Sequence, residues 1–462
     1  MKNTHQIIAM LSVITLLTSC QKFIDIKPNS TITLIQTSND CQLLLNDYAD
    51  LNTKFPSDGE ASSDDYYLEQ SGYEYYSVTA EDRTIYNWLP GALRAKAAPQ
   101  WQSTYYTVYI ANLVLDKLPT LTDKPSASVK NNIQGQALFF RAYSFWEVAQ
   151  LYAKPYTITT ANSDPGIPLR LSSDINGKST RGTVAQTYAQ IISDLQQAVT
   201  LLPDTLVVAS RPNKAAAYAM LARVYLCMGD YANAETNAGL SLKLNNQLID
   251  YNTLDTTSQN PFERFDKEDI FHAIMTPGNT LNPGGGSGSG AIVDSNLYAS
   301  YSDNDLRKFV FFKPNPGTDA GYYFTGNYEP QSGAELFDGL AVDEMYLTRA
   351  ECYARAGDVT NAMADLNTLL ITRWKTGTYV AMTASTADNA LTLILTERRK
   401  ELVMRGTRWT DLRRLNMDSR FAITLTRNIE GATYTLPPND LRYTLLIPQE
   451  VITNAGIAQN PR

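Results

Sequence analysis

Histidine is almost absent from this chain of 462 residues, which contains only His5 and His272. His5 falls in an N-terminal segment that we expect to be removed, so the mature protein would keep a single histidine. Catalytic arrangements that pair a histidine base with a cysteine or serine are therefore disfavoured, as are metal sites with several histidine ligands. His272 lies in the short strand-like run of residues 269–274, and we expect it to be structural.

Cysteine is scarce as well, with 4 residues in the whole chain. If Cys20 is lipidated, Cys41, Cys227 and Cys352 remain, and an odd number argues against a closed disulfide framework. Cys227 and Cys352 lie in apolar helical segments, at positions that suit a small apolar residue. We therefore expect both to be buried free thiols.

Long apolar runs and an excess of basic charge are missing too. Beyond the N-terminus, no segment is long and apolar enough to span a bilayer. The net charge of −8 does not indicate the basic surface that nucleic-acid binding requires. The glycine-rich stretch of residues 283–290 lacks the lysine and threonine that a phosphate-binding loop uses. We therefore expect no nucleic-acid partner and no cofactor.

The N-terminus carries the signs of an export signal. Lys2 provides a short positive region, and Ile7 to Leu17 form an apolar run. The run ends in Leu17-Thr18-Ser19-Cys20, which resembles a bacterial lipobox. We expect cleavage before Cys20 and lipidation of this residue, which would anchor the mature chain to a membrane through several acyl chains. The alternative is an ordinary signal peptide with an incidental cysteine.

The feature around which the chain is organised is the segment Lys214–Ser241, which predicts two helices joined by a turn at Gly229-Asp230. Its small residues allow close helix packing, and its spacing is typical of a tetratricopeptide (TPR) unit. A second copy follows at residues 343–374. The matched positions are Ala222 and Ala350, Tyr225 and Tyr353, Gly229 and Gly357, Asp230 and Asp358, Asn233 and Asn361, and Ala234 and Ala362.

Three more amphipathic segments, at residues 101–118, 131–153 and 183–202, can supply two further helical pairs. A lone pair cannot bury its apolar face, so the pairs should stack. We therefore predict a mainly α fold, a TPR-like scaffold of about four helical pairs carrying a region of irregular loops and short strands. The expected division is a signal peptide at 1–19, a helical N-terminal part at 20–250, an irregular ligand-presenting region at 251–342 and a helical C-terminal part at 343–462.

Several short motifs, in their order along the chain, together resemble the SusD/RagB family of the Bacteroidetes. Glu397 to Glu401 form a charge cluster that we expect to be a solvated helix face or a set of structural ion pairs. The motifs that carry the resemblance are Cys20 to Pro28, Gln136 to Tyr143, Pro165 to Leu169, Tyr188 to Pro203, Glu397 to Leu402, Gly406 to Arg414, Ile447 to Glu450 and Gln459 to Pro461.

The resemblance implies a protein that binds nutrients and catalyses no reaction. Family members are lipoproteins on the outer face of the outer membrane. They capture an oligosaccharide or a peptide and pass it to a SusC-like TonB-dependent transporter, a β-barrel. The resemblance also implies that the helices mostly face the transporter, whereas the irregular part presents the ligand surface.

Ligand contacts are expected among aromatic residues in loops, because a sugar ring stacks its apolar face on tyrosine or tryptophan. The chain is rich in tyrosine, with 28 residues. Asp64 and Asp65 are expected to take ligand hydroxyls; they lack the spacing of a calcium loop, and we expect no metal. The candidates are Tyr66, Tyr67, Tyr73, Tyr75, Tyr76, Trp88, Asp64, Asp65, Tyr298, Tyr301, Tyr322 and Tyr323.

Two other functional classes stay open at this point. A TPR scaffold that binds only other proteins would use the helical face and would lack a solvent-facing aromatic cluster. A glycan hydrolase would need a pair of carboxylates across the scissile bond, and the sequence singles out no such pair.

Overall fold

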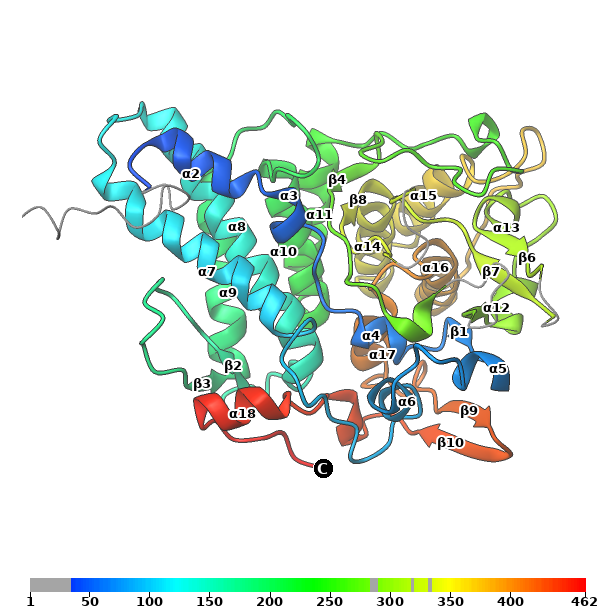
Figure 1. Ribbon diagram of the computed structural model, residues 1–462. Coiled ribbons are helices and arrows are strands. Elements are labelled where there is room, and N and C mark those ends of the chain that lie inside the picture. The colour runs from blue at the N-terminus through cyan, green and yellow to red at the C-terminus, as the bar shows by residue number, and fades with distance from the viewer. Residues whose placement is uncertain (1–34, 283–289, 317–319, 331–334) are drawn as a thin grey trace, which may run out of the picture.

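The computed structural model describes residues 35–282, 290–316, 320–330 and 335–462 (Figure 1). The expected signal segment, Cys20 and residues 283–289 of the glycine-rich stretch lie outside these ranges. Within them, no helix combines the length and the apolar character that crossing a membrane requires.

Long helices pack side by side in one continuous layer, which runs from α7 to α16 (Figure 1). Neighbours along the chain are neighbours in space, and the two predicted hairpins meet where α11 packs on α14. The mainly α, TPR-like fold is therefore confirmed. The helices are α7 (Gln102–Lys117), α8 (Ala127–Tyr152), α9 (Val184–Leu201), α10 (Lys214–Met228), α11 (Tyr231–Leu244), α14 (Val342–Arg355), α15 (Val359–Leu370) and α16 (Ala387–Glu401).

The residues shared by the two hairpins are those that form the turn. Gly229 ends α10 with φ +75°, and Gly357 has φ +86°, in the left-handed region that favours glycine. Asp230 then caps α11 by accepting a hydrogen bond from the backbone of Asn233, and Asp358 caps α15 in the same way. The matched alanines are fully buried, so the paired helices approach closely.

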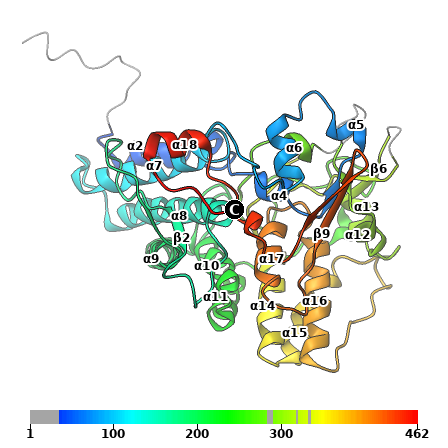
Figure 2. The same ribbon diagram turned by 90° about the horizontal axis from the view of Figure 1, so that it is seen from below.

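Short strands and short helices form a second part, which we call the short-strand lobe, beside α16 (Figures 1 and 2). Its strand pairs are antiparallel: β1 (Tyr66–Tyr67) with β5 (Ile292–Val293), β6 (Phe312–Pro314) with β7 (Tyr322–Phe324), and β9 (Leu425–Ile429) with β10 (Ala432–Leu436). The antiparallel pair of β4 (Asp269–Phe271) and β8 (Leu340–Ala341) packs on α10 and α14 of the helical layer. The short helices of the lobe are α4 (Asp58–Ala61), α5 (Gln70–Tyr73), α6 (Ala80–Tyr86), α12 (Ser295–Ala299) and α13 (Arg307–Val310).

Other short elements lie along the edges of the helical layer. α2 packs on α7 and α8, β2 pairs with β3 beside α9, and α17 contacts both α4 and α10. Their bounds are α2 (Ser38–Leu45), α3 (Tyr48–Leu51), β2 (Pro165–Pro168), β3 (Arg181–Thr183), α17 (Arg408–Leu415) and α18 (Gln449–Ala455).

Aromatic side chains make up most of the lobe's own core. Tyr251, Phe262 and Tyr328 pack edge to face or at a tilt, with ring centroids 4.7 to 5.5 Å apart along the series. Phe311 and Phe312 extend this core towards α12. Much of the chain's aromatic content therefore stabilises the lobe instead of facing solvent.

His272 is fully buried in the lobe between two carboxylates. Its Nδ1 contacts Asp269, and its Nε2 lies 3.4 Å from Glu329. Burial disfavours the charged imidazole, but the two carboxylates outweigh it and raise the pKa of His272 to about 9. This environment agrees with a structural role. Cys227 and Cys352 are buried free thiols, as expected.

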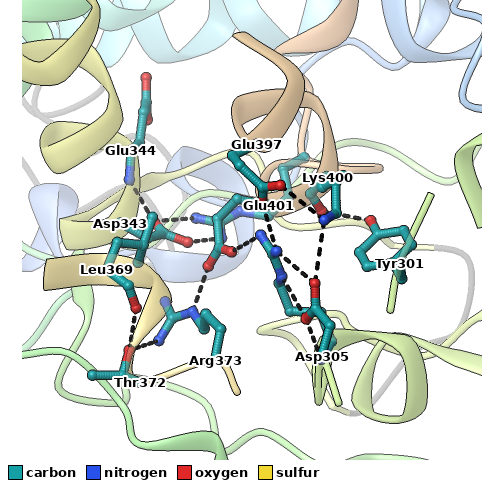
Figure 3. A network of polar contacts seen from close by, with 12 residues as sticks. Tyr301, Asp305, Asp343, Glu344, Leu369, Thr372, Arg373, Glu397, Lys400 and Glu401 are labelled. Carbon is teal, nitrogen blue, oxygen red and sulfur yellow. Dashed lines mark hydrogen bonds and ion pairs between the residues drawn. The ribbon is translucent and has the colours of Figure 1, made fainter. Parts of the chain in front are cut away.

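The charge cluster at the end of α16 is an interior ion-pair network (Figure 3). The carboxylate of Glu401 accepts hydrogen bonds from Arg307 at 2.9 Å and from Arg373 at 2.7 Å, and all three side chains are fully buried. Arg307 also binds Asp305 at 2.7 Å, and Arg373 binds Glu268 at 3.0 Å. We call this set the Glu401 network; it joins α16 to α13, to the end of α15 and to the segment before β4.

Removal of the Glu401 charge should weaken this network, although Arg307 keeps Asp305 and Arg373 keeps Glu268 as partners. Glu401→Gln is expected to lower the free energy of unfolding by about 2–3 kcal/mol, because it weakens the charge-assisted hydrogen bonds of residue 401 to Arg307 and Arg373 in the interior. The measurement is equilibrium unfolding in urea, followed by circular dichroism.

Asp388→Asn on the same helix provides the matched control. Asp388 pairs with Arg420 at the surface, where its side chain is 76% exposed, so its removal should leave stability unchanged. Equal effects of the two substitutions would contradict a special role for the Glu401 network.

Candidate functional site

Several of the predicted ligand contacts lie in the interior. Tyr66, Tyr73, Trp88 and Tyr301 are each at least nine-tenths buried. The Tyr66 and Tyr301 hydroxyls donate to backbone carbonyls at 2.9 and 2.7 Å, and the Trp88 indole donates to another at 2.9 Å. The Tyr73 hydroxyl accepts a hydrogen bond from the Asn87 amide at 2.8 Å. The expectation that these four contact a ligand is therefore corrected, because their polar groups serve the core.

Asp64 and Asp65 are engaged by arginines as well. Arg408 donates two hydrogen bonds of 2.6 and 2.9 Å to Asp64. Arg399 lies 3.2 Å from the carboxylate of Asp64 and 3.2 Å from that of Asp65. Burial opposes ionisation of Asp64, but Arg408 and Arg399 outweigh it and hold the pKa of Asp64 well below its usual range. These pairs tie the start of β1 to α16 and α17, so the two aspartates are structural in this conformation.

Three other candidates come together on the lobe. Tyr67 on β1 pairs with Ile292 on β5, and the chain enters β7 at Gly321, directly above them. A Cβ atom at Gly321 would lie 2.6 Å from the Ile292 side chain and 3.6 Å from the Tyr67 hydroxyl. Its φ of +120° also favours glycine. The backbone that enters β7, next to Tyr322, therefore lies close to the Tyr67 hydroxyl.

Tyr322 stacks on Tyr298, with ring centroids 3.7 Å apart and an angle of 15° between the planes. Asp294 caps the short helix α12 through the backbone of Leu297, which helps to position the Tyr298 ring. Tyr67, Tyr298 and Tyr322 are all partly exposed. We call these three residues the aromatic shelf.

A charged pair lies at the edge of the aromatic shelf. Lys308 Nζ is 5.3 Å from the Tyr298 ring centroid and 2.8 Å from Asp303. Burial and the neighbouring Tyr322 hydroxyl raise the pKa of Tyr298, so its hydroxyl stays protonated at neutral pH. The shelf thus offers flat aromatic rings together with hydroxyl, ammonium and carboxylate groups. Lys308 and Asp303 could not be expected from the sequence, since only the fold brings them to the Tyr298 ring.

The remaining candidates do not belong to the shelf. The Tyr323 side chain points to the opposite side of β7, where its hydroxyl donates a hydrogen bond to the Gln259 side chain. Tyr75 and Tyr76 pack on each other with ring centroids 4.5 Å apart, in the connection between α5 and α6. Tyr76 is 87% exposed, so this pair is a separate aromatic feature on the same lobe.

A further aromatic surface lies on the helical layer. Trp101, which directly precedes α7, stacks on Tyr105 of α7 with ring centroids 4.9 Å apart. With Tyr109 they line a cavity of about 360 Å³, whose opposite wall is formed by the β2–β3 connection and α18. Their spacing along α7 indicated only a helical stripe, because the segments that form the opposite wall are distant in the sequence.

A structural role for Asp64 predicts a pH-dependent effect. Asp64→Asn should lower the free energy of unfolding by about 2 kcal/mol at neutral pH, because it removes the charge-assisted bonds to Arg408. The depressed pKa contributes its full stabilisation above the unfolded-state value of about 3.9, and this contribution falls as the pH drops below that value towards the folded-state pKa, so the two proteins should differ less at pH 3 than at pH 7. Urea unfolding at pH 7 and pH 3 measures it.

Comparison with known proteins supports the family resemblance. A family described as "Starch-binding associating with outer membrane" matches residues 22–226, and the SusD family matches residues 343–461. The SusD-like protein P2 of Formosa agariphila is 24% identical over 295 residues, which cover 59% of this chain and 55% of that protein. The chain thus spans little more than half the length of this relative.

The fold is shared with solved structures over nearly the whole chain. A SusD superfamily protein from Bacteroides thetaiotaomicron has a TM-score of 0.72 at 24% identity, covering 92% of this chain and 100% of that one. The surface glycan-binding protein A from Bacteroides uniformis has a TM-score of 0.67 at 18% identity, covering 92% and 99%. At these identities the likeness shows the fold.

The family matches at both ends of the chain and the shared fold between them lead to one assignment. The resemblance to the SusD/RagB family is confirmed with it, and the description of the family that matches residues 22–226 associates that family with starch binding and with the outer membrane. This chain belongs to the SusD/RagB family.

Proposed function

We propose that this protein is a lipid-anchored receptor at the cell surface that binds an oligosaccharide on the aromatic shelf and delivers it to a SusC-like TonB-dependent transporter. The observation that carries the proposal is the stacked pair of Tyr298 and Tyr322, two partly exposed rings from separate chain segments, with the Tyr67 hydroxyl close to the backbone beside Tyr322.

The chemistry of the shelf suits a sugar. The C–H face of a pyranose ring packs on an aromatic ring, and the hydroxyl groups around its edge need both donors and acceptors. Lys308 supplies donors, Asp303 supplies acceptors, and the tyrosine hydroxyls supply both. A peptide is the alternative ligand, but the description of the matching family favours a glycan.

Delivery requires a surface for the transporter, and we place it on the helical layer. α2 packs on α7 and α8, and each of these helices exposes an apolar side chain there: Leu43 is 60% exposed, and Tyr106 and Val129 are each 44% exposed. Exposed apolar groups of this kind suit a protein interface. α2 is also the first described helix after Cys20, so the proposed interface lies at the anchored end of the chain.

Truncation of the shelf should weaken glycan binding. Tyr322→Ala is expected to lower the affinity for a bound oligosaccharide at least about tenfold, because it removes the stacked ring pair on which the sugar would rest. The measurement is isothermal titration calorimetry after a polysaccharide screen has identified a ligand of the unaltered protein.

Tyr106→Ala is the control, because Tyr106 is an exposed tyrosine on α7 rather than on the lobe. Its affinity should match that of the unaltered protein. If Tyr322→Ala binds normally, the shelf is not the site; if no glycan binds and a barrel still co-purifies, the alternative of a protein-interaction scaffold is favoured.

The anchor and the partner can be tested together in native cells. Affinity purification of the detergent-solubilised protein should recover a TonB-dependent barrel, and mass spectrometry should find acyl chains on an N-terminal Cys20. Cys20→Ser is expected to leave the protein unlipidated and outside the membrane fraction. An unmodified Cys20, or a preparation free of any barrel protein, would count against this part of the proposal.

A further inference from the structure

The aromatic cavity on the helical layer, which we call the α7 cavity, lies on the opposite side of the molecule from the aromatic shelf. Its lining comes from α7, from the connection between β2 and β3, and from α18, whereas the shelf belongs to the short-strand lobe (Figures 1 and 2). The two have no residue in common. A ligand of the α7 cavity would therefore bind independently of a ligand on the shelf.

The connection between β2 and β3 forms a fixed wall of this cavity. The Asn112 amide on α7 donates to the backbone carbonyl of Arg170 at 2.8 Å. One turn further along α7, Asp116 accepts hydrogen bonds of 2.8 Å from the backbone and from the hydroxyl of Ser173. Arg170 in turn donates to the Ser179 hydroxyl at 3.1 Å, across the connection. Ordering a loop costs conformational entropy, and here the ordered loop borders a cavity of about 360 Å³, as loops around ligand sites do.

Two aromatic residues of the lining carry polar groups that have no partner. Trp101 is only 6% exposed, yet its indole N–H makes no hydrogen bond to any described residue. The hydroxyl of Tyr109, whose ring is partly exposed, makes none either. Neither group is among the polar atoms that the described chain encloses completely, so both can be reached by a small molecule. The indole N–H groups that are enclosed belong to Trp146, Trp374 and Trp409.

The charge in the lining favours an uncharged ligand. Among its described residues the lining contains no carboxylate, so a cation would find no counter-charge there. Its one charged residue is Arg170, whose Nη atoms donate to the backbone carbonyls of Asp174 and Gly177 and to the Ser179 hydroxyl. A phosphate would therefore meet a single guanidinium that already holds the loop together.

The remaining surface suits a ring that is apolar on its face and polar around its edge. The Tyr105 hydroxyl is bound to the Pro168 carbonyl at 2.7 Å, so Tyr105 offers the cavity only its ring. The Trp101 indole can donate a hydrogen bond, and the Tyr109 hydroxyl can donate and accept. The Ser172 hydroxyl accepts from the backbone of Asp174 at 3.2 Å and keeps its proton to donate. A sugar ring has this combination of an apolar C–H face and hydroxyl groups around its edge.

We propose that the α7 cavity is a second sugar-binding site, which takes one uncharged sugar ring against Trp101, Tyr105 and Tyr109. The cavity has the volume of a small-molecule site and is too small for a long stretch of a polymer. It is expected to bind more weakly than the shelf, because its lining has no carboxylate to accept from the sugar hydroxyls. Together with the proposed site on the shelf, it would give one protein two points of attachment to a long glycan.

The experiment uses the purified protein with Tyr322→Ala, so that the shelf does not contribute. The probes are glucose, galactose and mannose, with cyclohexanol as a six-membered ring that has a single hydroxyl. A titration followed by the NMR signals of the probe should show at least one sugar that binds at least about tenfold more tightly than cyclohexanol. Crystals soaked with that sugar should hold its ring against Trp101 and Tyr109.

Two substitutions of Tyr109, each added to Tyr322→Ala, separate the contribution of its ring from that of its hydroxyl. Tyr109→Ala should weaken sugar binding at least about tenfold, because a wall of the cavity is lost. Tyr109→Phe keeps the ring and should weaken binding about fivefold, through loss of the hydroxyl alone. Tyr109→Phe is the decisive variant if Tyr109→Ala lowers the melting temperature.

Tyr106→Ala is the matched control, because Tyr106 is 44% exposed on the same helix and does not line the cavity. Added to Tyr322→Ala, it should leave the sugar affinity unchanged. The proposal is overturned by the absence of binding by all three sugars at millimolar concentration, by equal binding of cyclohexanol, by an unchanged affinity in Tyr109→Phe, or by soaked crystals that hold the sugar elsewhere. None of these results bears on the shelf, which is tested by Tyr322→Ala against the unaltered protein.

Discussion

The carboxylate of Glu401, shared between Arg307 and Arg373, is the interaction on which the arrangement of the two parts of the molecule depends. One side chain of α16 binds the segment that enters α13 and the segment that leaves α15, both in the dry interior. Bringing three charges out of water is unfavourable, and short, charge-assisted hydrogen bonds offset this cost only in one geometry. The network therefore favours a single placement of the short-strand lobe against the helical layer.

A short series of contacts links the Glu401 network to the aromatic shelf. The backbone carbonyl of Lys400, next to Glu401, accepts the Tyr301 hydroxyl, and Tyr301 packs on Phe312 at 5.3 Å. Phe312 on β6 pairs with Phe324 on β7, two residues beyond Tyr322. A rigid support of this kind reduces the loss of side-chain freedom when a ligand binds. The buried charges thus contribute to recognition without contacting the ligand.

The sequence was sufficient where structure is determined locally. Gly229, Asp230 and their copies near residue 357 specify a turn within a few residues, so both hairpins were predictable. The shelf was not, because Tyr66 and Tyr67 are adjacent and only the pairing of β1 with β5 buries one and exposes the other. A strand of two residues is too short to show the alternation of buried and exposed residues that would identify its faces. The partners of Glu401 could not be predicted from the sequence either, since Arg307 lies 94 residues away.

Arg307 and Arg413 show two ways in which the fold accommodates a buried guanidinium. Both are buried, and both would be unfavourable in isolation. The charge of Arg307 is balanced by acids from other segments, so its environment is complete within the fold. Arg413 meets no carboxylate, and its two Nη atoms bind backbone carbonyls at the C-terminal end of α8, where the helix dipole favours a positive charge. The composition of a helix such as α17 cannot separate these cases, because the difference lies in what the rest of the chain brings to each guanidinium.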